Sequence, residues 1–403
     1  MVDIGRGNPR TTLASQVGFL CLTFSALSST WAVTGKEQAA DKQTYATTLT
    51  ADRWLEDWSW IAPDETMPLK LKNLQFPPQS KMTLSLGGES RLRAESRDAM
   101  DFDLTRADSL ETANLRLLLH GNLTMANRVR VFMQVGSWDQ IGRESPRIFD
   151  ESTLVLQRGF FDWQVSNTTN LRLGRQDVLQ SASRLLIPVD VFNAQLVHDA
   201  VALHYRSGSL RGRLFLGKRF YADRGVFDTR DFGRAELAGM FVEGGFKRLP
   251  GFDFGLYWLS EWSDFGLFPQ RAGPERRQTA IVRQTWRKAP WAVSGEFGVQ
   301  NGTIDRRDIH AWAFASEITR QFALPGAIAL TLRVDGASGN RAGTQASETW
   351  ATFHPIMAYL GRGGDYGATN AIGIYPEVSF EPIRGLRASL GGEWVWRASS
   401  EAA

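Results

Sequence analysis

The sequence is poor in cysteine, in net charge and in long apolar runs. Its one cysteine, Cys21, lies in a segment that we expect to be removed, and a mature chain without thiols is compatible with an oxidising compartment. The formal net charge of the 403 residues is only +3, and basic residues are spread along the chain beside acidic ones. This distribution argues against nucleic acid as a partner, because nucleic-acid-binding proteins gather their basic residues into a patch. Beyond the N-terminal region no stretch approaches the roughly 20 apolar residues of a membrane-spanning helix, so a chain that crosses a membrane would do so as a barrel.

Glycine and aromatic residues, in contrast, are plentiful. The chain has 38 Gly, 14 Trp and 24 Phe but only 15 Pro. This mixture suits many short strands, tight turns and aromatic girdles. Arginine greatly outnumbers lysine, and its planar guanidinium is the better group for recognising carboxylates.

Residues 1–32 have the pattern of a secretory signal peptide. Arg6 and Arg10 supply a basic n-region, residues 17–27 form an apolar core, and cleavage after Ala32 fits the small-residue rule. The core is too short for a permanent membrane anchor. We therefore expect Sec-type export and removal of this segment; the alternative is a frayed N-terminal helix.

Residues 33–80 are polar and irregular, and we expect them to form a periplasmic segment packed near the base of a barrel. Prolines interrupt regular structure there, and three tryptophans lie close together in sequence, Trp54, Trp58 and Trp60. The tryptophans fit either a partner surface or internal packing, and packing is the favoured interpretation.

From Lys81 onward the sequence falls into runs of about ten residues that alternate in polarity and are separated by turn residues. A period of two places the polar and apolar sets on opposite faces of a strand. Asn127 marks a tight turn between two such runs and predicts a hairpin. The pattern predicts about fifteen strands in residues 81–403. The expected fold class is all-β, an antiparallel transmembrane β-barrel of the outer membrane in contact with its lipid.

A soluble sandwich or propeller also alternates in polarity, and two features favour the membrane over it. Strand after strand carries arginine on one face. The opposite faces carry tryptophans near strand ends, where an interfacial girdle would lie, at Trp258, Trp286, Trp291, Trp394 and Trp396.

Several motifs give the chain a family resemblance. They are Glu56-Asp57-Trp58-Ser59, the LSLGGE run of residues 84–89 followed by Arg91, Arg93 and Glu95, the LRLGRQ run of residues 171–176, the LLIPVD run of residues 185–190, and Trp396-Arg397-Ala398-Ser399-Ser400. Together they resemble the alginate export family of outer-membrane porins, over about residue 53 to the C-terminus. Each motif is weak alone, and the LGGE and LRLGRQ pieces are fairly specific in combination.

The resemblance implies an eighteen-stranded antiparallel barrel, within the size range of such proteins, that carries an anionic polysaccharide such as alginate outward. It also implies periplasmic export machinery as a partner. We expect no catalytic residue, cofactor or metal, because the sequence has no hydrolase motif and its histidines lack metal-ligand spacing. By motif position, the candidates for the anion-attracting lining are Arg91, Arg93, Arg116, Arg130, Arg172 and Arg397. The acidic partners expected to orient them are Glu89, Glu95, Glu296 and Glu393.

The C-terminus departs from the family pattern. In the family the "WR-x-S" element is followed by further strands and an aromatic C-terminus, whereas this sequence ends at Glu401-Ala402-Ala403. With an odd number of strands, the first and last strands would run parallel if the barrel closed. If it did not close, two strand edges would stay open in lipid, where unpaired backbone N–H and C=O groups are costly. We therefore expect either a truncated relative or an unconventional closure.

Other classes of function stay open as alternatives. A general porin without selectivity and a non-conducting structural barrel share the same pattern. An outer-membrane hydrolase is less favoured, because the sequence has no G-x-S-x-G or H-E-x-x-H motif. His198 beside Asp199, with His204 nearby, could support a catalytic triad, but a satisfied lumen or turn histidine is favoured. The glycine-rich residues 361–367 lack the lysine of a phosphate-binding loop and are expected to form a loop.

Overall fold

The structure is a computed structural model. It describes residues 52–62, 65–76, 81–97, 110–126, 128–142, 150–186, 193–220, 222–229, 234–264, 273–341, 346–350 and 369–399, together with the backbone of residues 17–26. In this part of the chain no helix is long and apolar enough to cross a membrane. The 3₁₀ turns are η1 (Arg53–Leu55) and η2 (Leu69–Lys72).

Strands make up almost all of the regular structure. They are β1 (Val17–Ala26), β2 (Leu74–Gln75), β3 (Met82–Arg97), β4 (Leu110–Met125), β5 (Val129–Ile141), β6 (Ser152–Gln164), β7 (Thr169–Gln176), β8 (His198–Ser207), β9 (Leu210–Arg219), β10 (Ala235–Gly245), β11 (Phe252–Ser263), β12 (Glu275–Lys288), β13 (Trp291–Ile304), β14 (Arg307–Gln321), β15 (Ala329–Ala337), β16 (Ala371–Ile383) and β17 (Leu386–Trp396).

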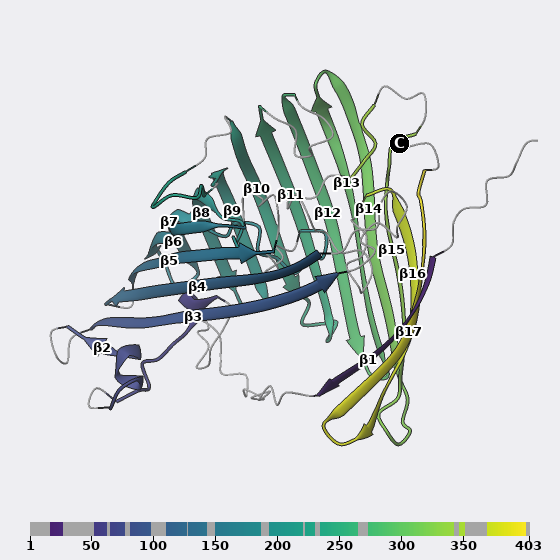
Figure 1. Cartoon of the computed structure of the whole chain (residues 1–403), viewed down its shortest axis with the longest axis horizontal. Coiled ribbons are helices and arrows are strands. Elements are labelled where there is room, and N and C mark those ends of the chain that lie inside the picture. Colours follow the sequence, from purple (N-terminus) through teal and green to yellow (C-terminus); the bar gives the residue numbers. More distant parts are fainter. Residues whose placement is uncertain are drawn as a thin grey trace, which may run out of the picture.

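Each strand from β3 to β17 pairs antiparallel with the next, so the chain forms one continuous curved sheet. Figure 1 shows the blue strands β3–β8 crossing the green and yellow strands β10–β17 at a steep angle. Opposite walls of a barrel cross in this way because every strand is tilted by about 35–45° to the barrel axis. The predicted all-β, antiparallel barrel class is therefore confirmed, with the hairpin of β4 and β5 where Asn127 predicts a turn.

Alternation along the strands separates an outer face from an inner face. On β4, Arg116 is 1% exposed whereas the next residue, Leu117, is 46% exposed. On β5, Phe132 is fully buried and Met133 is exposed. The outer face is thus apolar and the inner face carries the polar side chains, as the sequence pattern predicts.

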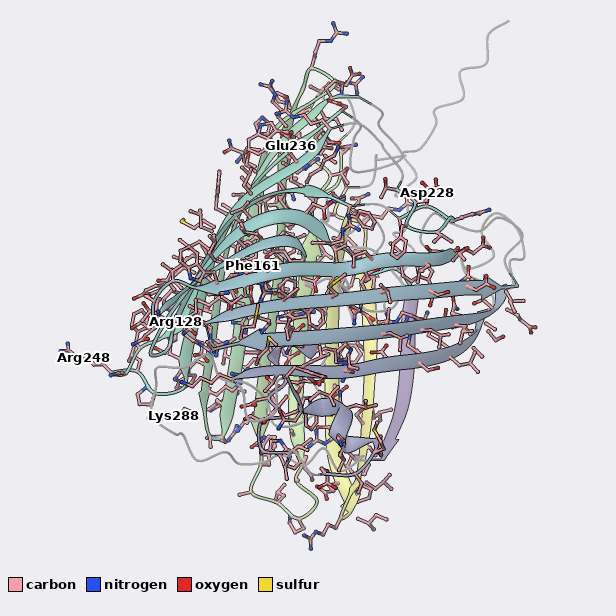
Figure 2. The ribbon with its side chains drawn as sticks, turned by 90° about the vertical axis from the view of Figure 1, so that its left-hand side faces the viewer. Arg128, Phe161, Asp228, Glu236, Arg248 and Lys288 are labelled. Carbon is pink, nitrogen blue, oxygen red and sulfur yellow. The ribbon has the colours of Figure 1, made fainter. Side chains whose placement is uncertain are left out.

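The connections between strands differ in length at the two rims of the sheet. One rim, called here the short-turn rim, has tight connections such as residues 126–128, 208–209, 289–290 and 384–385. At the opposite, long-loop rim the strand ends are separated by longer stretches of sequence, as between β3 and β4, β7 and β8, β9 and β10, and β15 and β16. In Figure 2, Arg128, Arg248 and Lys288 of the short-turn rim lie toward the lower left, and Asp228 of a long connection lies on the other side. This asymmetry is typical of outer-membrane barrels.

The sheet does not close on itself. The strands β3 to β17 number fifteen, in agreement with the sequence pattern, so β3 and β17 run in the same direction. No pairing register joins β17 to β3 among the described residues; β2 pairs with β3, and β1 pairs along the whole of β17. Because β1 lies within the expected signal peptide, cleavage would remove it from this edge. That cleavage stays a prediction.

Candidate functional site: the inner face of the sheet

Two irregular segments lie against the inner face. We call residues 52–61 the plug segment and residues 177–186 the inner loop. The plug segment packs on β5–β7, since Trp54 contacts Phe132 and Phe160. The inner loop packs on the opposite wall, where its Leu185 and Leu186 share an apolar cluster with Phe241 and Tyr257 among others. Part of the segment expected at the barrel base therefore lies inside the sheet, and a periplasmic location for residues 33–80 stays a prediction.

Trp54 anchors the plug segment. Its side chain is 4% exposed and meets the rings of Phe132 and Phe160 edge-on, with ring centroids 5.7 Å away in each case. The guanidinium groups of Arg158 and Arg172 lie over the indole at 5.3 and 5.5 Å. Trp54 therefore has the packing role favoured for this tryptophan cluster, whereas Trp60 of the same segment is 60% exposed.

Two predicted lining arginines are buried beneath the plug segment and paired. Arg172 binds Asp162 through two parallel hydrogen bonds, Nε to Oδ1 at 2.6 Å and Nη2 to Oδ2 at 2.9 Å. Arg130 donates from Nη1 to the carbonyl of Trp54 at 2.8 Å and lies 3.5 Å from Asp162. Both arginines thus hold the plug segment and a carboxylate.

The predicted pairing of arginines with acids also occurs at the start of the barrel. Glu89 accepts from Arg116 at 2.5 Å and from Arg53 of the plug segment at 3.4 Å. Arg53 in turn pairs with Glu56 at 3.0 Å. Arg91 of β3 is half-buried. Two residues further along the same strand, Arg93 pairs with Glu95 at 2.5 Å. Acids therefore neutralise most of the predicted cationic lining on β3–β7.

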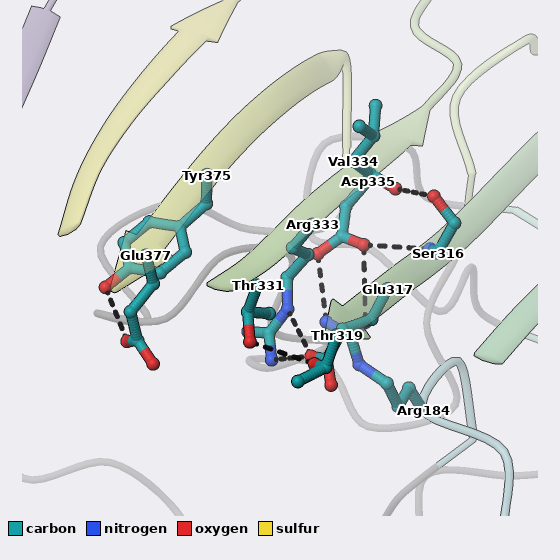
Figure 3. Close-up of polar contacts among 10 residues, drawn as sticks. All are labelled: Arg184, Ser316, Glu317, Thr319, Thr331, Arg333, Val334, Asp335, Tyr375 and Glu377. Atoms are coloured by element: carbon teal, nitrogen blue, oxygen red, sulfur yellow. Dashed lines mark hydrogen bonds and ion pairs between the residues drawn. The ribbon is translucent and has the colours of Figure 1, made fainter. Parts of the chain in front are cut away.

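The inner loop is fixed by two acids of the opposite wall. Glu296 of β13 accepts from the Ser183 hydroxyl at 2.6 Å and from the Arg184 amide at 2.9 Å. The Arg184 guanidinium reaches Asp335 of β15 at 3.3 and 2.9 Å (Figure 3). Glu296 was expected to orient an arginine side chain; it holds the backbone and a hydroxyl of the inner loop.

Polar pairs continue across β14–β16. Arg333 donates to Glu317 at 3.1 and 2.5 Å, and the Tyr375 hydroxyl donates to Glu377 at 3.0 Å (Figure 3). The remaining predicted residues lie at the last strand: Glu393 is buried on the inner face of β17, whereas Arg397 is exposed just beyond the strand. Arg397 therefore does not belong to the strand lining.

Sequence reasoning missed the residues that the inner loop brings together. Arg213 of β9 donates to the carbonyls of Val178 and Gln180 at 2.9 and 2.7 Å, and Arg158 binds Asp177 at 3.0 and 2.7 Å. No local pattern gives these contacts, because each joins a strand to an irregular segment.

A cross-strand pair of arginines was also missed. Arg206 of β8 lies directly opposite Arg211 of β9, on the same inner face as His204 and Arg213. Neither has a carboxylate within ion-pair distance among the described residues. The neighbouring acid on β10, Glu243, is held by the Ala182 amide and the Tyr257 hydroxyl, both at 2.9 Å. The signal was present, since a two-residue turn at Gly208-Ser209 would pair these two positions.

The pKa values of the plug segment depend on its burial. Burial raises the pKa of Asp52 above its usual range, and the nearby Asp177 acts in the same direction. A hydrogen bond from Gln180 opposes this rise, as do Arg158 and Arg172. Asp52 thus joins the plug segment to the inner loop through a contact that is sensitive to its protonation.

His198 and its neighbour Asp199 do not form a catalytic dyad. His198 is buried on the inner face of β8, whereas Asp199 is exposed and pairs with Arg175 at 2.8 Å. Consecutive residues of a strand face opposite sides, so these two cannot form a dyad. Within the described ranges, no group of three or more His, Cys, Asp or Glu side chains could hold a metal ion. Residues 361–367 lie outside the described residues.

A model of the alginate export family matches residues 82–403. The chain belongs to this family. It is therefore an outer-membrane β-barrel of the channel class rather than of an enzyme class. In such barrels the short turns face the periplasm, which places the short-turn rim there.

Solved structures and curated proteins were compared as well. The chain is similar to the outer-membrane protein OpdK from Pseudomonas aeruginosa, with a TM-score of 0.48 and 12% identity over 78% of this chain and 97% of that one. It is similar to OccK2 from the same organism, solved with glucuronate, at a TM-score of 0.47 and 10% identity over 78% and 96%. An anion-selective porin from Comamonas acidovorans gives a TM-score of 0.43 and 10% identity over 78% and 99%. Among curated proteins, none matches this sequence.

Proposed function

We propose that this channel passes an anionic saccharide, such as an acidic polysaccharide of the alginate type, and that Arg206 and Arg211 form its periplasmic anion-binding pair. Like charges directly opposite each other on neighbouring strands destabilise a sheet. These two guanidinium groups lie opposite each other on the inner face, and neither makes an ion pair among the described residues; Glu243, which lies opposite Arg211 on β10, is held instead by the Ala182 amide and the Tyr257 hydroxyl. A solute that supplies the missing negative charge relieves this repulsion. This pair is the observation that carries the proposal.

The pair lies where an exported solute would enter. β8 ends and β9 begins at the short-turn rim, so Arg206 and Arg211 lie within a few residues of the periplasm. A guanidinium binds a carboxylate with two parallel hydrogen bonds and stays charged at all accessible pH values. Deeper in the barrel the arginines carry their own carboxylates, as at Arg172 and Asp162. A solute that moves past them meets only weak sites, as conduction requires.

The test is the reversal potential of the refolded chain in a planar bilayer under a salt gradient. The double variant Arg206→Gln/Arg211→Gln should lower the anion preference and weaken block by an added oligo-uronate. The matched control is Lys247→Gln/Arg248→Gln, which removes the same charge from an exposed turn of the same rim. Equal reversal potentials in the two double variants would refute the assignment.

The ion pairs favour a second candidate, a general porin without charge preference. Each paired arginine of β3–β7 has an acid beside it, so the net field of that wall is small. A wild-type reversal potential near zero, with no block by oligo-uronate, would support this candidate instead.

A further inference from the structure

The outer wall of the barrel contains a hollow that the channel function does not use. It lies over β13–β17 and has a volume of about 850 Å³. Its wall includes Trp291, Phe322, Leu332 and Trp394, with Arg320 at one end. Trp291, Leu332 and Trp394 are exposed on the apolar outer face.

The hollow exists because side chains are missing from its floor. Gly392 lies between Leu390 and Trp394 on the outer face of β17, where a residue with a side chain would fill the space. Pro376 of β16 has no backbone N–H, and no pair is recorded for Tyr375 and Pro376 between the pairs Ile374–Trp394 and Glu377–Gly391, although the register is the same on both sides. A proline and a glycine together thus leave a shallow floor between larger apolar neighbours.

The hollow combines apolar walls with one cation. Arg320 is exposed at the end of β14, and its guanidinium lies 5.2 Å from the ring centroid of Trp291 and 4.9 Å from that of Phe322. It has no carboxylate partner among the residues that the structure describes. The polar side chains at the floor point toward the lumen instead. The Thr331 and Thr319 hydroxyls form a hydrogen bond with each other, and Glu377 accepts a hydrogen bond from the Tyr375 hydroxyl.

The position of Arg320 identifies the leaflet that the hollow faces. Arg320 and Trp291 lie at the short-turn rim, which is periplasmic in this family's barrels. An arginine stacked on aromatic rings at this depth is at the level of phospholipid headgroups. Lipopolysaccharide belongs to the opposite leaflet and would place its phosphates at the long-loop rim.

We propose that this hollow binds one glycerophospholipid of the periplasmic leaflet, with an acyl chain along the floor at Gly392 and the phosphate on Arg320. The guanidinium supplies charge-assisted hydrogen bonds to phosphate oxygens. The aromatic rings beside it fix the guanidinium in place. The proposal concerns the lipid-facing wall and holds whatever solute the lumen passes.

The test is native mass spectrometry of the full refolded chain in mild detergent, titrated with dioleoyl phosphatidylglycerol. The wild-type chain should retain one tightly bound lipid. Arg320→Gln should weaken this binding by about tenfold or more, as expected for the loss of a hydrogen bond to a charged group, and Arg320→Lys should restore part of it. Lys288→Gln, at the same rim but outside the hollow, is the matched control and should bind like the wild type.

Two further arms separate the parts of the site. Dioleoylglycerol, which has the chains but no phosphate, should bind weakly, and Gly392→Leu should prevent retention by filling the floor. Heat-modifiable gel mobility reports folding of each variant; if Gly392→Leu does not fold, the Arg320 comparison still decides. The proposal is overturned by equal binding in Arg320→Gln and Lys288→Gln, by equal binding of dioleoylglycerol, by displacement of the lipid with lipopolysaccharide, or by retention of detergent alone.

Discussion

Replacing Trp54 with alanine should release the plug segment from the inner face. The indole is 4% exposed and packs between Phe132 and Phe160, with two guanidinium groups over it. Truncating a buried tryptophan to alanine costs about 3–5 kcal/mol. At the lower end of that range the docked-to-undocked ratio falls by a factor of about 100, since 1.4 kcal/mol is a factor of ten.

Two assays report this release. Trypsin should cleave the variant faster after Arg53, because docking buries that residue between Glu56 and Glu89. Single-channel recordings should show a larger fraction of time at high conductance, because the segment no longer occupies the lumen. Trp60→Ala is the matched control, since Trp60 lies in the same segment and is 60% exposed. If both variants resemble the wild type in cleavage rate and conductance, Trp54 does not hold the segment and the reasoning is wrong.

Three further predictions concern the wall and the lumen. Leu117→Arg should lower the yield of membrane-inserted protein, because an arginine on the lipid face near the midplane costs about 2–4 kcal/mol. Asp162→Ala should lower the free energy of unfolding in urea by about 3–5 kcal/mol, because it leaves the buried Arg172 without its carboxylate. Acidification should lower the conductance, because the plug segment lies on the inner face and its docking strengthens at low pH. The raised pKa of Asp52 means that docking prefers the protonated carboxyl, so docking strengthens as the pH falls through that pKa and weakens above it. Asp52→Asn should flatten this pH dependence of the conductance.

Each of these predictions has a contrasting variant or outcome. Leu249→Arg places the same charge on an exposed turn of the short-turn rim and should insert normally. Asp199→Ala removes an exposed acid from a pair with Arg175 and should cost no more than about 1 kcal/mol. A conductance that rises on acidification in the wild type would contradict the role given to Asp52.

The wall of the barrel could be predicted from the sequence because it depends on local alternation. Arg116 and Leu117 differ in exposure for no reason other than their parity along β4. The same parity places Tyr257 and Glu261 inside and Leu256 and Trp258 outside. A two-residue period needs no knowledge of distant residues, so the strands and their faces follow from it.

The contents of the lumen could not be predicted in this way. Arg184 meets Asp335, and Ser183 meets Glu296, across more than a hundred residues of sequence. These contacts depend on the curvature of the sheet and on an irregular segment that has no periodic pattern. The acids that neutralise the lining arginines could be named only partly in advance: Glu89, the partner of Arg116, was among the expected acids, whereas Asp162, the partner of Arg172, was not.

The plug segment is covalently joined to β3 by a short stretch of chain. Its binding to the inner face is therefore intramolecular, with an effective concentration set by the length and stiffness of the connecting residues, which include η2 and β2. Docking of this segment on the inner face does not depend on how many copies of the protein the membrane holds. A free peptide with the same residues would compete only at comparable concentrations, so each chain carries its own docking segment in a fixed ratio of one to one.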